Sequence, residues 1–260
     1  ISYRLVGSEM CIRDRSGLIG CGKSSATLGV GNYNSARVSN ADVRMAGSSS
    51  VKAGEVYYRC SNADAAAELE IAVDDDNLTV NYTGEIRAGE EPPCEVTVHS
   101  NSINTLSIEQ NSSTAITIED SMNVERLEGD SVDIFVESDG SVDIGELQTS
   151  NLLIDMTGGG SLDIEHTHAN WMNITLDGNT AVLLGDVESS YMDLYARGTA
   201  SLWAEGHCES ALIDLDGNVT LDAEGLEVGS ADITAGGSTE VSLTVTDSLT
   251  LDASGSSSVD

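Results

Sequence analysis

The sequence predicts an all-β fold, a single-stranded parallel β-helix with rungs of about 20 residues, preceded by a block of other strands. Three observations predict it. From residue 131 onward the chain repeats at a step of 20 residues. Within each repeat, apolar residues recur at every second position, the period of a strand with one buried face. The 260 residues include 26 glycines and only 4% aromatic residues, which favours small β-branched cores joined by glycine turns.

The first 16 residues differ from the rest of the chain. They are basic, show no periodicity, and contain the string GSEMCIRDR, which resembles translated sequencing-adapter read-through. The segment that follows, Leu18-Ile19-Gly20-Cys21, resembles a bacterial lipobox in which Cys21 becomes acylated. We therefore expect residues 1–30 to be a non-native segment, a lipobox remnant and a flexible tether, and we exclude them from the fold.

The same stretch also matches the phosphate-binding pattern GxxxxGK[ST], from Gly17 to Ser24. That motif requires a buried strand before it and a helix after it, so that backbone N–H groups face the phosphates. Basic residues precede it here and a glycine-punctuated stretch follows it. The sequence argues against a nucleotide site.

Charge is distributed unevenly along the chain. Residues 1–60 carry 8 basic and 4 acidic residues, whereas residues 61–260 carry 3 basic and 40 acidic residues. The charge of −37 in the second part excludes nucleic-acid binding through phosphate neutralisation. It also argues against electrostatic docking on anionic lipid. No stretch approaches 18 apolar residues. We therefore expect membrane contact only through a lipid anchor.

Residues 31–95 predict an N-terminal block of strands. Strands are expected around residues 56–58, 69–73 and 78–82, with Asp74-Asp75-Asp76-Asn77 as the turn of a hairpin. Pro92-Pro93 ends this block because proline cannot donate to a β-ladder. Cys60 and Cys94 flank the block and are a candidate disulfide in an oxidising compartment.

Residues 96–260 predict about eight rungs. Each row holds two short strands ten residues apart, separated by a glycine turn containing Gly140, Gly160, Gly178 or Gly198. In a parallel stack, equivalent positions form columns. A Ser/Asn ladder is expected at one corner from the residues that close each row, Ser150, Asn170, Ser190, Ser210 and Ser230. The alternative, an antiparallel sandwich, does not require one residue class at a fixed offset. The chain stops within a rung at Asp260, so we expect truncation at the C-terminus.

The rung alignment predicts which side chains lie inside. We expect Ile134, Ile154, Ile174 and Leu194 in one buried column, and Asp133, Asn173 and Asp193 outside it. Asp143 and Asp163 lie 20 residues apart, so they should be outward-pointing neighbours about 4.8 Å apart. They are weak candidates for metal contact. We expect no cofactor, apart from Ca²⁺ or Mg²⁺ held loosely by surface carboxylates.

These features together resemble one known family. A strand block ending in DDDNLTVNY, a Pro-Pro-Cys entry, the segment CEVTVHSNSINTLSIEQNSS and the reiterated SVDI rungs are similar to the bacterial auto-transporter adhesin, head GIN domain family. The resemblance covers about residues 30–260. It implies a right-handed β-helix, export to the outer membrane, cell surface or periplasm, and a lipid anchor.

Other candidate chemistry is weak. His166 and His168 form an HxH pair on one strand face, which suits metal ligation, but the repeat places no third histidine or cysteine nearby. Gly158-Gly159-Gly160 only partly matches a calcium-binding repeat. Rows of 20 residues leave no room for the long loops in which β-solenoid lyases and hydrolases hold their sites. The sequence therefore argues against an enzyme.

We expect a non-enzymatic exported surface lipoprotein whose acidic β-helix presents a face for adhesion or envelope interaction. Its partner would be a cell-surface or extracellular ligand, either a glycan or a protein. Two alternatives stay open, a carbohydrate-active β-helix enzyme and a structural or sensory periplasmic module.

Overall fold

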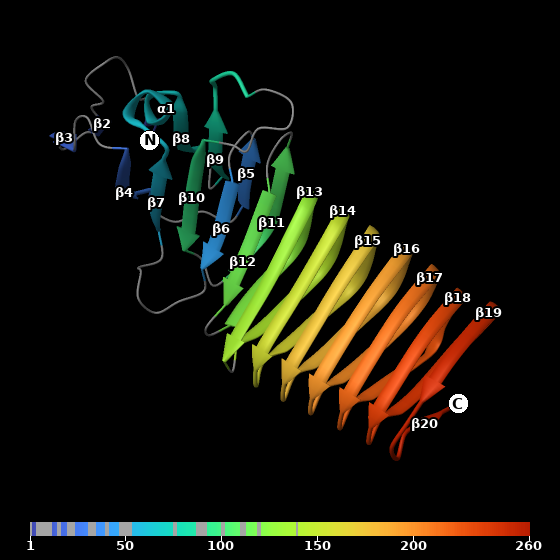
Figure 1. Cartoon of the computed structure of the whole chain (residues 1–260). Coiled ribbons are helices and arrows are strands. Elements are labelled where there is room, and N and C mark those ends of the chain that lie inside the picture. The colour runs from blue at the N-terminus through green and yellow to red at the C-terminus, as the bar shows by residue number, and fades with distance from the viewer. Residues whose placement is uncertain are drawn as a thin grey trace.

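The computed structural model describes most of the chain beyond its first 23 residues. The described residues are 2–3, 12–14, 17–19, 24–30, 35–39, 42–46, 54–74, 77–86, 93–99, 102–109, 113–118, 121–138 and 140–260. They form a parallel β-solenoid with a strand-rich N-terminal part stacked on its first rungs (Figure 1).

The predicted parallel β-helix is confirmed. Each long strand is bent around one complete rung and pairs in parallel with the next, which gives about seven turns rather than eight. The strands are β13 (Ser121–Ser138), β14 (Ser141–Gly158), β15 (Ser161–Gly178), β16 (Ala181–Gly198), β17 (Ser201–Gly217), β18 (Thr220–Gly237), β19 (Glu240–Ala253) and the short β20 (Ser258–Val259).

The predicted core column is also confirmed. Ile134 pairs with Ile154, Ile154 with Ile174 and Ile174 with Leu194, and all four side chains are buried. Their neighbours Asp133, Asn173 and Asp193 lie on the outer side of the same strands and are half-buried. The alternation therefore fixes the register, because a slip by one residue would bring these polar groups into the core.

The turn glycines belong to two columns rather than one. Gly178 and Gly198 stack on Gly158 and adopt positive φ, where a Cβ on Gly178 would lie 2.5 Å from the Gly158 carbonyl oxygen. This close approach, together with the left-handed backbone, requires glycine. Gly140 and Gly160 instead stack in a buried column that later rungs fill with side chains, Thr180, Ala200, Val219 and Thr239.

The expected Ser/Asn ladder is wrong beyond Ser190. Ser210 pairs with Tyr191, because the pairing of β16 with β17 shifts by one residue between Leu184 and Val187. Ser230 pairs with Ser210, so both serines lie in the column of Tyr191 and not in the column of Ser190. The corner is instead stabilised by the inward-pointing residue just before it, whose side chain donates a hydrogen bond to the backbone carbonyl oxygen two residues later. These hydrogen bonds run from Thr149 to Asn151 at 2.9 Å, from Ser189 to Tyr191 at 3.0 Å and from Cys208 to Ser210 at 3.1 Å.

The N-terminal part continues the stack out of sequence order. β5 lies between β9 and β11, and β6 lies between β10 and β12, all in parallel pairing. β5 and β6 therefore supply a rung beneath β11 and β12. These strands are β5 (Ser35–Ser39), β6 (Asp42–Ala46), β9 (Asn77–Tyr82), β10 (Cys94–His99), β11 (Ser102–Glu109) and β12 (Ser113–Ile118).

Antiparallel strands complete this part of the molecule. The predicted hairpin is confirmed as β8 with β9, and β7 pairs with both β4 and β10. A short helix, α1, was not predicted, and Asn62 caps it by accepting a hydrogen bond from Ala65 N at 2.8 Å. The remaining elements are β1 (Ser2–Tyr3), β2 (Ile12–Asp14), β3 (Gly17–Ile19), β4 (Ser25–Gly29), β7 (Glu55–Cys60), α1 (Ala63–Ala67) and β8 (Leu69–Asp74).

Truncating the core column should destabilise the solenoid. Replacement of Ile174, which is fully buried, by alanine should lower the free energy of unfolding by about 2–5 kcal/mol, measured by urea denaturation. The matched control is Thr175→Ala on the outer side of the same strand, which should change it by no more than about 1 kcal/mol. Equal losses in the two variants would contradict the assigned register.

Candidate functional site

The solenoid presents three outward walls, each one strand segment wide. In β14 they are the outward residues of 141–145, of 146–150 and of 151–157, and ladder partners in the other rungs extend each wall along the stack. We call them the acidic wall, the histidine wall and the aromatic wall. Any surface function of the stack depends on what these three walls carry.

The acidic wall brings two predicted residues together. Asp143 and Asp163 are exposed ladder neighbours, with Glu165 two residues along the strand from Asp163. Partial burial raises the pKa of Asp163 above the ordinary aspartate value, and the charges of Asp143 and Glu165 raise it further. The same column continues with Leu183 and Trp203, so the run of carboxylates ends after two rungs.

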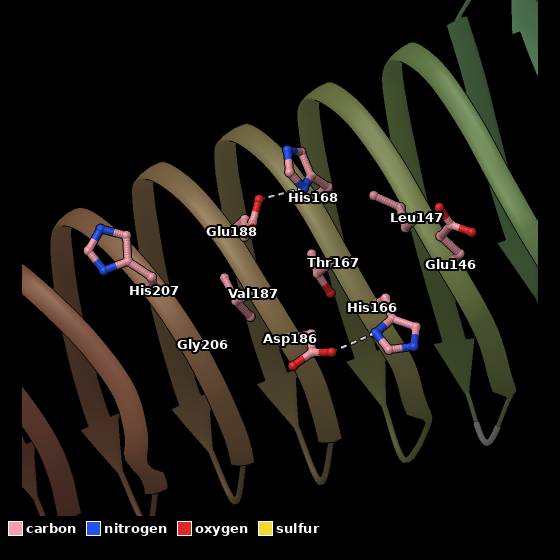
Figure 2. A pocket seen from close by; sticks show the side chains of 10 residues that line it. All are labelled: Glu146, Leu147, His166, Thr167, His168, Asp186, Val187, Glu188, Gly206 and His207. Carbon is pink, nitrogen blue, oxygen red and sulfur yellow. Dashed lines mark hydrogen bonds and ion pairs between the residues drawn. The ribbon is translucent and has the colours of Figure 1, made fainter.

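The histidine wall alternates imidazoles with carboxylates along the stack. His166 Nδ1 lies 2.8 Å from Asp186 Oδ2, and His168 Nδ1 lies 3.0 Å from Glu188 Oε2, each pair joining two neighbouring rungs. All four side chains are more than half exposed. Figure 2 shows His166 and His168 on either side of Thr167, each turned toward its own carboxylate.

This geometry does not bring the HxH pair onto one ion. The two imidazoles diverge in Figure 2, and His207 follows His168 only after Glu188 has intervened in the ladder. Nowhere in the described part of the chain do three or more His, Cys, Asp or Glu side chains gather as a metal site. The wall is instead a shallow polar surface, lined by Glu146, His166, His168, Asp186, Glu188 and His207.

Arg126 belongs to the same wall. It contacts Glu128 on its own strand and lies 2.9 Å from Glu146 on the next rung. Its guanidinium is thus held by two carboxylates. Arginine, glutamate, histidine and aspartate follow one another along this column, as Arg126, Glu146, His166 and Asp186.

The aromatic wall was not predicted from the sequence. Trp171 and Tyr191 are ladder neighbours whose ring centroids lie 4.3 Å apart with their planes tilted by 33°. Trp171 keeps 50% of its surface exposed. Further along β16, Arg197 packs over the ring of Tyr195, with Cζ 4.5 Å from the ring centroid. The sequence did indicate that Trp171, Tyr191, Tyr195 and Arg197 point outward, because all four occupy outward positions in the period-two alternation.

The cysteines fall into three situations. Cys60 and Cys94 face each other across β7 and β10 with their sulfur atoms 2.09 Å apart, as a disulfide. Cys208 is buried, which raises the pKa of its thiol and leaves it a poor nucleophile. Cys21, the predicted acylation site, lies outside the described residues. No helix within the described ranges has the length and apolar character needed to cross a membrane.

One family matches most of the chain. The sequence profile described as "Putative auto-transporter adhesin, head GIN domain" matches residues 60–200 and 165–260. No curated protein matches the chain.

Several solved structures are similar at low sequence identity. A "putative adhesin" from Bacteroides fragilis shares 16% identity, covering 90% of this chain and 94% of its own, with a TM-score of 0.34. A "putative adhesin" from Parabacteroides merdae shares 14%, covering 91% and 94%, with a TM-score of 0.37. A "putative lipid binding protein" from Parabacteroides distasonis shares 14%, covering 90% and 94%, with a TM-score of 0.40. Similarity at this level does not establish a shared ligand.

The partial burial of Asp163, together with its repulsion from Asp143, predicts a pH effect on stability. Because the folded-state pKa of Asp163 is raised, its contribution to stability is present below the ordinary aspartate pKa and is lost as pH rises through the folded value. Asp163→Asn should therefore raise the melting temperature at pH 7 and flatten its dependence on acid pH. Since Asp163 is exposed, the gain should be on the order of 1 kcal/mol or less.

Thermal melts between pH 3 and pH 7 measure this effect, at low and high sodium chloride. Salt should reduce the difference between wild type and Asp163→Asn, because exposed charges are screened. Asp222→Asn is the control, since Asp222 lies in the same wall beside Trp203 rather than beside another aspartate. A lower melting temperature for Asp163→Asn than for wild type would refute repulsion at this site.

Proposed function

The chain belongs to the family described as "Putative auto-transporter adhesin, head GIN domain", and from this premise we propose that it is a non-enzymatic exported surface lipoprotein. Its β-helix would present the outward walls for adhesion or contact with the cell envelope. The observation that carries the proposal is the uninterrupted stack from β13 to β19, which offers flat walls of repeating outward side chains. Such a scaffold suits attachment to an extended partner better than enclosure of a small substrate.

The regularity of the rungs argues against the enzymatic alternative. From β14 to β19 each strand is joined to the next by two residues, so no long loop encloses a cleft over these rungs. The two arginines between Ser121 and Ala253 are already engaged, Arg126 with carboxylates and Arg197 with an aromatic ring. Lyase chemistry on an acidic polymer would require a cation free to neutralise the carboxylate of the substrate.

Charge would set the kind of partner. With 44 acidic and 11 basic residues, the molecule repels polyanions and attracts neutral or cationic surfaces. We include in the proposal a loose association of Ca²⁺ or Mg²⁺ with the surface carboxylates, spread over several places rather than held in one cage. Such ions would lower the repulsion between the protein and an anionic cell surface.

Adhesion can be measured directly with the whole chain. Fluorescent beads coated with the purified protein should be retained on bacterial or epithelial cell layers above the level of beads coated with albumin. Millimolar calcium should increase retention and a chelator should reduce it, because the bound ions screen the carboxylates. Retention no greater than that of albumin beads on every surface, with and without calcium, would refute adhesion.

The lipid anchor is a separate prediction. When the chain from Leu18 onward is placed behind a bacterial lipoprotein leader, Cys21 should take up radiolabelled palmitate and the protein should sediment with membranes. Cys21→Ser should abolish both. Cys208→Ser is the matched control because that cysteine is buried and Ser189 fills the equivalent position one rung earlier. A soluble, unlabelled wild-type protein would refute the anchor.

A further inference from the structure

The aromatic wall has a composition that the adhesive scaffold alone does not explain. Only 4% of the residues are aromatic, yet Trp171, Tyr191 and Tyr195 all point outward from two adjacent rungs. Leu212, in the next rung of the same wall, is 40% exposed. Trp171 and Leu212 are exposed, and Tyr191 and Tyr195 beside them are half-buried. Apolar surface gathered in this way is typical of an interaction surface.

The polar side chains near the rings all carry oxygens that accept hydrogen bonds. Asn173 and Asp193 are ladder neighbours that lie between Tyr191 and Tyr195 along the strand direction, and Asp155 and Asp214 lie on the rungs at either side. Amide and carboxylate oxygens accept hydrogen bonds from hydroxyl groups, and the amide also donates. Flat apolar rings interleaved with such groups match a sugar polymer, whose rings have apolar C–H faces and a rim of hydroxyls.

The dimensions favour a polymer over a small ligand. Tyr191 and Tyr195 are four residues apart on one strand, about 13 Å, and Trp171 lies one rung from Tyr191, about 4.8 Å. The shallow hollows around His166, Asp143 and Gln148 are lined by residues of the other two walls. A ligand held by Trp171, Tyr191 and Tyr195 together would lie across the wall.

Charge selects among the polymers. The wall carries carboxylates on nearly every rung, including Asp133, Asp155, Asp193, Asp214 and Asp232, whereas Arg197 is its one cation within β13–β18. A polyanion such as a uronic-acid or sulfated chain would be repelled, and so would an acidic protein. A second copy of this chain would bring the same carboxylates face to face.

We propose that the aromatic wall around Trp171 and Tyr191 binds neutral polysaccharide chains by stacking, with Asn173 and Asp193 directing sugar hydroxyls and with Tyr195, whose ring Arg197 covers, at the edge of the contact. This inference rests on the proposed adhesive function and names its ligand class. The ligand is retained by an extended contact, so each aromatic residue should contribute separately to affinity.

Affinity electrophoresis of the whole chain tests the inference. Native gels contain starch, mannan, xylan or mixed-linkage β-glucan, and a parallel gel contains alginate as the polyanion. We expect at least one neutral polymer to retard the wild-type protein and alginate to leave it unretarded. Trp171→Ala and Tyr191→Ala should each weaken the apparent affinity for that polymer by about tenfold. Tyr191→Phe keeps the ring and should retain most of the binding.

The matched control is Tyr57→Ala on β7, an aromatic residue that is 37% exposed but lies outside the solenoid walls. It should leave retardation unchanged. No retardation by any neutral polymer, equal retardation of wild type and Trp171→Ala, or stronger retardation by alginate would each overturn the inference. A change in oligomeric state of Trp171→Ala on size-exclusion chromatography, without a change in retardation, would show that a second copy covers the wall and would also overturn it.

The bead assay separates this inference from the function on which it rests. If beads coated with the Trp171→Ala, Tyr191→Ala double variant adhere as well as wild type, adhesion stands and the aromatic wall is not its site. If wild-type beads do not adhere while the gels show retardation, the wall binds polysaccharide and the adhesive function fails.

Discussion

The parallel ladder between rungs is the constraint on which this structure depends. Nearly every residue of β14 lies between a partner in β13 and a partner in β15, each about 4.8 Å away, so each side chain packs against the equivalent side chains of the neighbouring rungs. Inside, this produces continuous columns of buried side chains, most of them isoleucine, leucine, valine, methionine and alanine. At the turns it forces backbone against backbone, which is why Gly158, Gly178 and Gly198 follow one another. Sequence repetition is therefore a direct consequence of the hydrogen-bond geometry.

The same ladder governs the electrostatics of the surface. A stack that repeated an aspartate in every rung would accumulate repulsion along the column. The acidic wall has such a pair in Asp143 and Asp163, and Leu183 and Trp203 then interrupt it. On the histidine wall, His166 and His168 each meet a carboxylate of the next rung instead of another imidazole. A chain with a formal charge of −33 thus distributes its like charges among columns.

Much of this arrangement could be predicted from the sequence, and the exceptions have physical causes. The period of two and the step of 20 residues identified the fold and the column of Ile134, Ile154, Ile174 and Leu194, because burial imposes both periods on the sequence. Helix α1 was missed because it is only five residues long and depends on the Asn62 cap. The register shift that moves Ser210 was missed because β17 has one residue fewer than β16 at a corner. The apolar alternation on either side of that corner is unchanged, so the sequence pattern does not reveal the shift. The aromatic wall was missed because a single sequence shows that a residue points outward without showing which residues of other rungs lie beside it.

The out-of-order rung of β5 and β6 has a consequence for how the molecule is made. Ala36 pairs with Leu106, and Val43 pairs with Thr114, whereas contacts in the regular stack join residues one rung apart. During synthesis or translocation from the N-terminus, residues 35–46 have no ladder partner on that side until β11 and β12 have emerged. Closing such distant contacts is slow compared with adding a rung to an existing edge. We therefore expect the ladder of β5 and β6 with β11 and β12 to close more slowly than each later rung is added to the stack.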